Sequence, residues 1–457
     1  MARSVDADSG RVALTTAAAE VERGDLGWFQ AGLVLFTFAA PSAVVGVAYS
    51  VGMAGLLGGP LLCITITTAS IGGSFMLLQL KLAFPDSHTL GDLGFEIMGR
   101  PGKIWGNIIQ LGNFVLFLPV ALLLCATALK GVVAIPAFQG CDDYYTLLVA
   151  LFCLLTTQLR TLQNTQVLSS ISLVCVFGIA ALQIVAALRY RTEDSTPARL
   201  FGNPDKHWIL RSTEALLGAT TAAWAYVPAF LTVELTTCMR YPKHLVRSLA
   251  FSGVLNVVIF VGVGVTVVAS WGYDVSDPVM LTKVAAWSGG NWLGKSLSLL
   301  LLIGNFVSYS LDSVPLARYC QKAWLPDFGD TWSARDIALY LLCTLPTFFF
   351  GLILALAVPN LFVLLAFTTA LTVPWVTQIY PAVLYWKRFC TPSSVSERCE
   401  LGDPRPGLFG RLGIAAVFGV GCASFVVCLA AAVGKAALTQ LRGPSQIGCA
   451  GWIIWRG

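Results

Sequence analysis

The chain has 457 residues, of which 56% are hydrophobic and only 12% are charged, and its formal net charge is +5. Charged residues make up about a quarter of an ordinary soluble domain, so this composition excludes a water-soluble globular protein and predicts a multi-pass integral membrane protein. The 13 cysteines form no CxxC or Cys/His pattern, and the three histidines fall in loops, so neither a metal site nor a cofactor is expected. A small positive charge is typical of membrane-protein loops, so nucleic-acid binding is not expected either.

The predicted elements are a polar tail at 1–27 and then a series of apolar runs, each near the roughly 20 residues that a bilayer span needs. Eleven spans, numbered one to eleven below, are predicted at 28–53, 59–83, 104–129, 144–160, 167–188, 212–238, 248–272, 292–318, 334–356, 359–385 and 408–433. The segment 28–433 is therefore predicted to be one transmembrane domain, followed by a C-terminal tail at 434–457.

The distribution of basic residues predicts the orientation. If the N-terminus is cytoplasmic, most of the 29 Lys and Arg residues fall in the inner loops and the N-terminal tail. Basic residues favour the cytoplasmic side, so we expect the N-terminus inside and, after an odd number of spans, the C-terminal tail outside. A plasma membrane and a vacuole-like membrane fit these loops equally well, and the sequence does not indicate the oligomeric state.

Three segments form a recognisable pattern along the chain. They are AYSVGMAGLLGGPLL at 48–62, HTLGDLGFEIMGRPGKIW at 88–105 and VELTTCMRYPKHLVRSL at 233–249. In this order and spacing they resemble the first hairpin, the glycine-rich loop before span three and the Glu-Leu-x-x-x-Met-x-x-Pro signature of the amino acid/auxin permease family. The resemblance covers about residues 28–433, and it implies a secondary transporter in a lipid bilayer rather than an enzyme.

That family is similar to LeuT-type carriers, which implies an all-α fold whose first five and second five spans are inverted repeats, with spans one and six broken at the midplane. Pro41 in span one and Pro228 in span six occupy equivalent positions. Proline lacks a backbone donor and clashes with the preceding turn, so each helix is expected to kink or unwind there. Ordinary membrane-helix prolines are the alternative, since Pro119, Pro315 and Pro374 also lie in spans.

The substrate is expected to bind between the two breaks. The candidate substrate-binding residues are Ala40, Pro41, Ser42, Ala43, Asn113, Tyr226, Val227, Pro228, Phe230, Asn305 and Tyr309. The chain has Pro-Ser-Ala at 41–43 where the family has Gly-Ser-Gly, and Pro-Ala-Phe at 228–230 where it often has Gly-His-Gly. Proline offers no amide to a substrate carboxylate, so the binding contacts are expected to differ from the family's. For Asn113, a hydrogen bond between helices is the favoured interpretation.

Two acids lie within predicted spans and are candidates for ion coupling or gating. Glu234 lies roughly 8 Å from the cytoplasmic boundary, too shallow for the midplane, so it is either part of a gate, paired with an inner-loop base, or a static pair that fixes the helix end. Asp312 shares one helical face with Asn305, Ser308 and Tyr309. Asp312 either exchanges a proton or pairs with a base such as Arg318.

The function predicted from these observations is the symport of an amino acid or related small solute by alternating access, with the proton as coupling ion. Sodium is the alternative ion, because Ser42, Ser308 and Ser310 offer hydroxyl oxygens, although span one lacks the asparagine of sodium-coupled relatives. A nutrient sensor that resembles a transporter but carries no flux is the alternative function.

Overall fold

The computed structural model describes residues 26–133, 143–157, 166–189, 200–201, 218, 223–224, 231–272, 292–324, 334–358, 361–391 and 407–441. Within them the chain is helical, apart from one isolated bridge between Leu26 and Met239. The helices are α2 Trp28–Thr37, α3 Ala40–Ala54, α4 Gly58–Ala83, α5 Leu90–Met98, α6 Arg100–Val132, α7 Asp143–Thr156, α8 Gln166–Arg189, α10 Thr232–Cys238, η4 Pro242–His244, α11 Leu245–Trp271, α13 Trp292–Trp324, α14 Ala334–Ala357, α15 Leu361–Pro374, the π-helix η6 Trp375–Ile379, α16 Tyr380–Phe389 and α18 Leu408–Leu441.

Eight of the described helices are long and apolar enough to cross a membrane, and the bent pair α2 and α3 makes a ninth if it counts as one span. A further apolar helix, at Asp143–Leu155, is shorter. The predicted span six, 212–238, falls largely outside the described residues, which include only its last part as α10. The count of eleven spans therefore stays a prediction, whereas the all-helical, multi-pass architecture is established.

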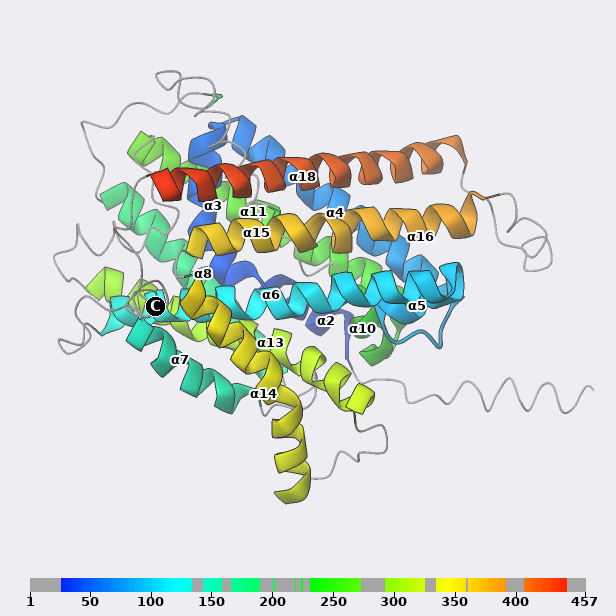
Figure 1. The fold of residues 1–457 in the computed structure, drawn as a ribbon. Helices are drawn as coiled ribbons and strands as arrows, with labels where there is room; N and C mark the ends of the chain where they lie inside the picture. The colour runs from blue at the N-terminus through cyan, green and yellow to red at the C-terminus, as the bar shows by residue number, and fades with distance from the viewer. Residues whose placement is uncertain are drawn as a thin grey trace, which may run out of the picture.

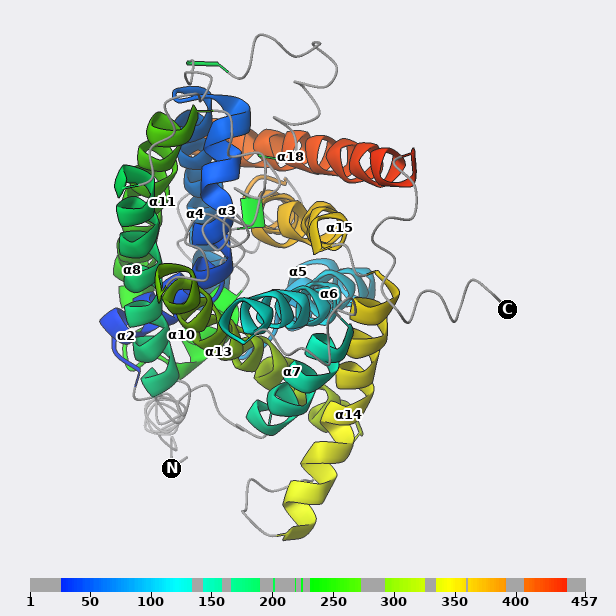
Figure 2. The same ribbon diagram turned by 90° about the vertical axis from the view of Figure 1, so that its left-hand side faces the viewer.

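The helices form a bundle with two groups (Figure 1). Figure 2 shows α3, α4, α8 and α11 together on one side and α6, α7 and α14 on the other, and α13 contacts both groups. The most apolar windows of α13 and α6 are 78% and 72% buried, against 28% and 22% for α14 and α18. The interior of the bundle is therefore lined by α6 and α13, while α14 and α18 lie at its periphery.

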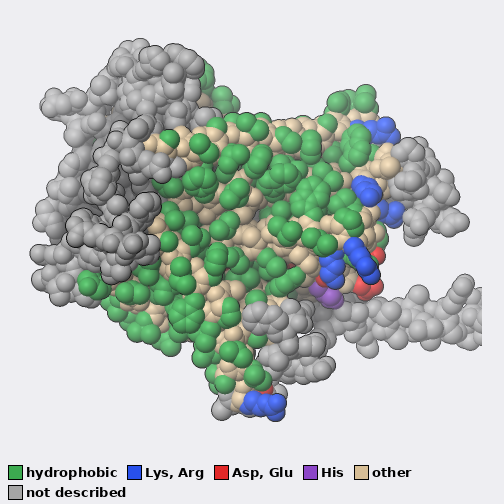
Figure 3. All heavy atoms as spheres, viewed as in Figure 1, with side chains coloured by type: hydrophobic (Ala, Val, Ile, Leu, Met, Phe, Trp, Pro, Cys, Tyr) green, Lys and Arg blue, Asp and Glu red, His purple; other side chains and the backbone are tan. Residues whose placement is uncertain are grey.

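The face of the molecule seen in Figure 3 has an apolar body and a charged end. Hydrophobic side chains extend along the helices, while most of the visible Lys, Arg, Asp, Glu and His side chains gather at the end where α5 and the last turn of α16 lie, and a smaller group lies at the start of α14. An exposed ion pair between Lys103 and Asp92, 3.7 Å apart, lies at this end. A bilayer would cover the apolar body and leave the charged end in water. In water, a single exposed ion pair such as Lys103–Asp92 contributes little to the stability of the fold. This end is the one that the sequence predicts to be cytoplasmic.

Candidate functional site

Span one is bent just before Pro41. The helix α2 ends at Thr37, α3 begins at Ala40, and the two axes differ by 54°. The ring of a helical proline clashes with the carbonyl four residues earlier, which for Pro41 is that of Thr37. The bend therefore precedes the proline instead of lying at Pro41–Ala43, and Pro41 occupies the first turn of α3, where proline is tolerated. The Thr37 carbonyl accepts a hydrogen bond from Ser172 Oγ of α8 at 3.5 Å.

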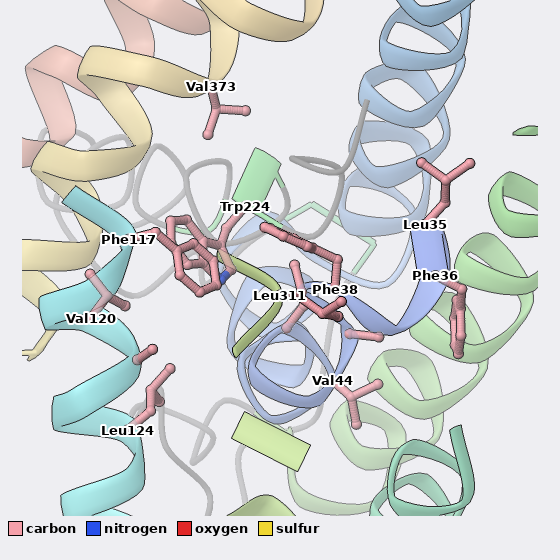
Figure 4. Packing of buried hydrophobic residues seen from close by; sticks show 14 of the residues in the cluster. Leu35, Phe36, Phe38, Val44, Phe117, Val120, Leu124, Trp224, Leu311 and Val373 are labelled. Carbon is pink, nitrogen blue, oxygen red and sulfur yellow. The ribbon is translucent and has the colours of Figure 1, made fainter. Parts of the chain in front are cut away.

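An aromatic cluster covers this bend. We call Phe38, Ser42, Phe117 and Trp224 the bend cluster. The indole of Trp224 stacks on Phe117 with centroids 4.6 Å apart and planes 9° from parallel, and Phe38 lies 5.4 Å from Phe117. Trp224 Nε1 donates a hydrogen bond to Ser42 Oγ at 3.1 Å, and Ser42 Oγ donates to the Ala39 carbonyl at 2.9 Å. Figure 4 shows Trp224 and Phe117 face to face with Phe38 and Leu311 beside them.

The bend cluster brings together spans one, three and six. Ala40, Pro41, Ser42 and Ala43, the candidates in span one, are all buried there. The sequence reasoning missed Trp224, Phe117 and Phe38; the signal for Trp224 was an aromatic residue one helical turn before Pro228. The remaining span-six candidates, Tyr226, Val227, Pro228 and Phe230, lie outside the described residues.

The polar stripe of span eight faces the bundle interior. Asn305, Ser308, Tyr309 and Asp312 are each at most 1% exposed on α13. Asn305 Nδ2 donates to the Leu301 carbonyl at 2.9 Å, and Ser308 Oγ donates to the Gly304 carbonyl at 3.3 Å. A β-carbon on Gly304 would lie 2.8 Å from Pro41 Cβ, so α13 meets the bend of span one directly beside this stripe.

Asp312 has an unusual environment for a carboxyl group. The residue is 0% exposed, and neither carboxyl oxygen has a hydrogen-bond partner within the described part of the chain. The alternative pairing with Arg318 is therefore absent from this structure. A buried, unpaired carboxylate costs several kcal/mol, roughly, in desolvation. A carboxyl group in such a place is therefore more stable when it is neutral or bound to a cation than as a free carboxylate.

Further polar groups without a hydrogen-bond partner among the described residues lie on α13 and on the helices around it. They are both amide atoms of Asn113 on α6, Tyr309 Oη on α13 and Thr369 Oγ1 on α15. The helix α6 packs against both α13 and α15, and Thr368 Oγ1 donates to the Leu116 carbonyl at 3.3 Å. Among the described residues, the interhelical hydrogen bond favoured for Asn113 is therefore not seen, and its amide is buried.

Glu234 belongs to a second cluster near the charged end. Its Oε1 accepts a hydrogen bond from Gln110 Nε2 of α6 at 2.9 Å, and Gln110 Oε1 accepts one from the Leu90 N–H at 3.1 Å. Leu26 N donates to the Cys238 carbonyl and Arg240 N to the Leu26 carbonyl, both at 3.1 Å, which ties the segment before α2 to the end of α10. Leu26, Leu90, Gln110, Glu234 and Cys238 form what we call the inner cluster.

A basic residue, Arg318, acts electrostatically on the inner cluster. The Glu234 carboxylate and the Arg318 guanidinium both act electrostatically on the Cys238 thiol, with opposite sign. Glu234 thus lies between α6 and the inner ends of α10 and α13, apart from the bend cluster.

A helical bundle with a bent first span and buried polar groups on its central helices is the architecture of a membrane transporter of LeuT-like fold. The structure of MhsT in complex with L-phenylalanine is similar to this chain, with a TM-score of 0.58 and 13% sequence identity, covering 90% of this chain and 100% of that one. At this identity the likeness shows the fold alone.

The family model of transmembrane amino acid transporter proteins matches residues 24–425, and the chain belongs to this family. A similar curated protein is the N amino acid transport system protein of Neurospora crassa, which is 22% identical over 379 residues, or 79% of this chain and 76% of that protein. The family and this relative are transporters and not enzymes. The resemblance seen in the sequence motifs is thereby confirmed.

Proposed function

We propose that this protein is a secondary active symporter that carries an amino acid or a related small solute, coupled to the movement of protons, by alternating access. Membership of the transmembrane amino acid transporter family supports the amino acid as the substrate class. The single observation that supports proton coupling is Asp312, which is fully buried on a central helix and has no hydrogen-bond partner among the described residues. A carrier that couples accumulation to protons needs a group that takes up and releases a proton during the cycle, and we assign this role to the Asp312 carboxyl.

The proposed substrate site lies between the bend of span one and span six, against α13. The bend between Thr37 and Ala40 places the buried first turn of α3 at this site. Gly304 lets α13 approach Pro41, so the polar stripe of α13 lies beside the same bend. Asn113 and Tyr309 carry unpartnered polar atoms that suit the ammonium and carboxylate of an amino acid. Tyr226, Val227, Pro228 and Phe230 complete the proposed site from span six.

The hydroxyl groups near the bend are the candidate ligands for sodium, the alternative coupling ion. Ser308 Oγ and Ser310 Oγ donate to the carbonyls of Gly304 and Phe306 in their own helix. Ser42 Oγ donates to Ala39 and accepts from Trp224. A hydroxyl that donates one hydrogen bond keeps an oxygen lone pair for a cation, so these contacts leave sodium as the alternative, and the preference for the proton depends on Asp312.

The test is the uptake of radiolabelled amino acids into proteoliposomes, with sodium replaced by choline and the external pH varied between about 5 and 8. Because protonation from outside loads the carrier, uptake is expected to rise as the external pH falls and to persist in choline. Empty liposomes give the background. Uptake that stops without sodium and ignores pH contradicts proton coupling. Substrate binding without any flux indicates the nutrient sensor instead.

A further inference from the structure

The glycine-rich segment 88–105 folds into a tight helical hairpin. The helix α5 turns back onto the first turns of α6 through Gly99, whose φ of +69° is a left-handed conformation that favours glycine. A β-carbon on Gly94 would lie 2.5 Å from the Gly102 carbonyl oxygen, and one on Gly106 would lie 2.8 Å from that of Leu90. The glycines therefore allow the backbones of α5 and α6 to touch.

Tyr380 of α16 inserts into this hairpin. It is 0% exposed, and its hydroxyl donates a hydrogen bond to the Gly102 carbonyl at 2.8 Å. A β-carbon on Gly94 would lie 2.0 Å from the same hydroxyl oxygen, and one on Gly106 would lie 2.7 Å from it. The ring also meets that of Trp105 edge to face at 5.2 Å. Gly94 and Gly106 thus leave room for one phenol group.

The position of Tyr380 is fixed by the π-helix that precedes it. A β-carbon on Gly73 of α4 would lie 1.9 Å from the Thr377 carbonyl oxygen, and one on Gly421 of α18 would lie 2.9 Å from Gln378 Cβ. Gln378 Nε2 also donates to Ser70 Oγ at 3.3 Å. The π-helix η6 is therefore held between α4 and α18. Such insertions are often found at functional sites, and this one sets the rotation of α16 that points Tyr380 at α5.

Two consecutive hydrogen bonds connect the hairpin to Glu234. Leu90 is the first residue of α5, and its N–H binds the Gln110 side chain, which in turn donates to Glu234. If α5 shifts on α6, Gln110 loses the donor that orients its amide. Its hydrogen bond to Glu234 is then weakened.

We propose that Tyr380 is a positioning residue for the inner gate: by clamping α5 onto α6 it keeps Gln110 on Glu234 and so stabilises the state that is closed at the charged end. The inference rests on the proposed transport function for its kinetic consequence. Its structural consequence, the order of α5 and α10, does not depend on transport.

The kinetic test uses Tyr380→Phe, which removes the hydroxyl and keeps the ring. Losing one buried hydrogen bond changes the equilibrium constant between the closed and open states by about fivefold, so KM for uptake from the opposite side is expected to rise by up to about fivefold while the maximum rate changes less. In a Gln110→Leu background, which already lacks the link, Tyr380→Phe should add no further change in KM. The matched control is Tyr385→Phe, on the same helix as Tyr380, which removes the hydrogen bond from Tyr385 Oη to Gln79 of α4. Its effect should be the same in both backgrounds.

The structural test is amide hydrogen exchange of the same variants. Tyr380→Phe is expected to speed exchange in both Leu90–Met98 and Thr232–Cys238, and Tyr385→Phe in neither. Unchanged exchange in Thr232–Cys238, or the same KM factor for Tyr380→Phe in both backgrounds, overturns the inference. Absence of uptake by the wild-type chain would instead count against the proposed function, while the exchange measurement still decides the role of Tyr380.

Discussion

Ser42 and Asp312 are both buried polar side chains, but of the two only Ser42 makes hydrogen bonds among the described residues. The Ser42 hydroxyl uses its donor on Ala39 and accepts from Trp224, so it is held in place, and substrate reaches it only if Trp224 moves. The Asp312 carboxyl has no hydrogen-bond partner in the described chain. A buried polar group without a partner is unfavourable unless it has another use. The role of Ser42 in substrate binding stays a prediction, and we propose that Asp312 is the group that changes state.

Replacing the Asp312 carboxyl with an amide tests this reading. Asp312→Asn keeps the shape and cannot lose a proton, so we expect uptake in proteoliposomes to lose its dependence on external pH and accumulation to fall to the equilibrium ratio of one. The control is Ser313→Ala on the same helix, where the Ser313 hydroxyl donates to the Ser310 carbonyl at 3.1 Å. Ser313→Ala should retain the pH dependence. A pH dependence that survives in Asp312→Asn places the proton site elsewhere.

At the scale of elements, close backbone contacts decide how span ten sits in the bundle. The π-helix η6 presents the Thr377 carbonyl to Gly73 of α4, where a β-carbon would lie 1.9 Å away. In a membrane, helices associate through close packing of small residues, because burial from lipid provides little driving force. The contact between α4 and η6 is thus a structural requirement, and Gly73 is the residue that permits it.

We therefore expect Gly73→Ala to destabilise the protein by about 1–3 kcal/mol, the usual cost of overpacking. Gly112 of α6 offers a matched control, because a β-carbon there would meet nothing within 4 Å. Gly112→Ala should be neutral or slightly stabilising, since alanine favours a helix over glycine. Thermal unfolding in detergent, followed by the monodisperse fraction on size exclusion, separates the two. Equal midpoints for both variants contradict the required contact.

At the scale of the whole molecule, sequence reasoning succeeded where a property belongs to a single segment. Hydrophobic length predicted the long spans, such as α4 and α6, because crossing a bilayer depends on local composition. Pro41 predicted a bend in span one, although the bend precedes it, because the clash falls on Thr37. The pairs Trp224–Ser42 and Gln110–Glu234 join residues 182 and 124 positions apart. No local pattern encodes such pairs, and the roles of the site residues stay predictions.

The orientation of the whole bundle is the remaining whole-molecule prediction. The charged end visible in Figure 3 carries α5 and the end of α16, both next to loops that are predicted to be cytoplasmic. With an odd number of spans, the two tails must lie on opposite sides. We expect a cysteine at Ser445 to react with a membrane-impermeant maleimide in sealed cells that express the protein at their surface, and one at Ser9 to react only after permeabilisation. The unsubstituted chain, with its 13 native cysteines, gives the background labelling. Labelling of both tails from the same side would mean an even number of spans, whereas labelling of Ser9 alone would mean that the basic residues face outward, against their usual preference.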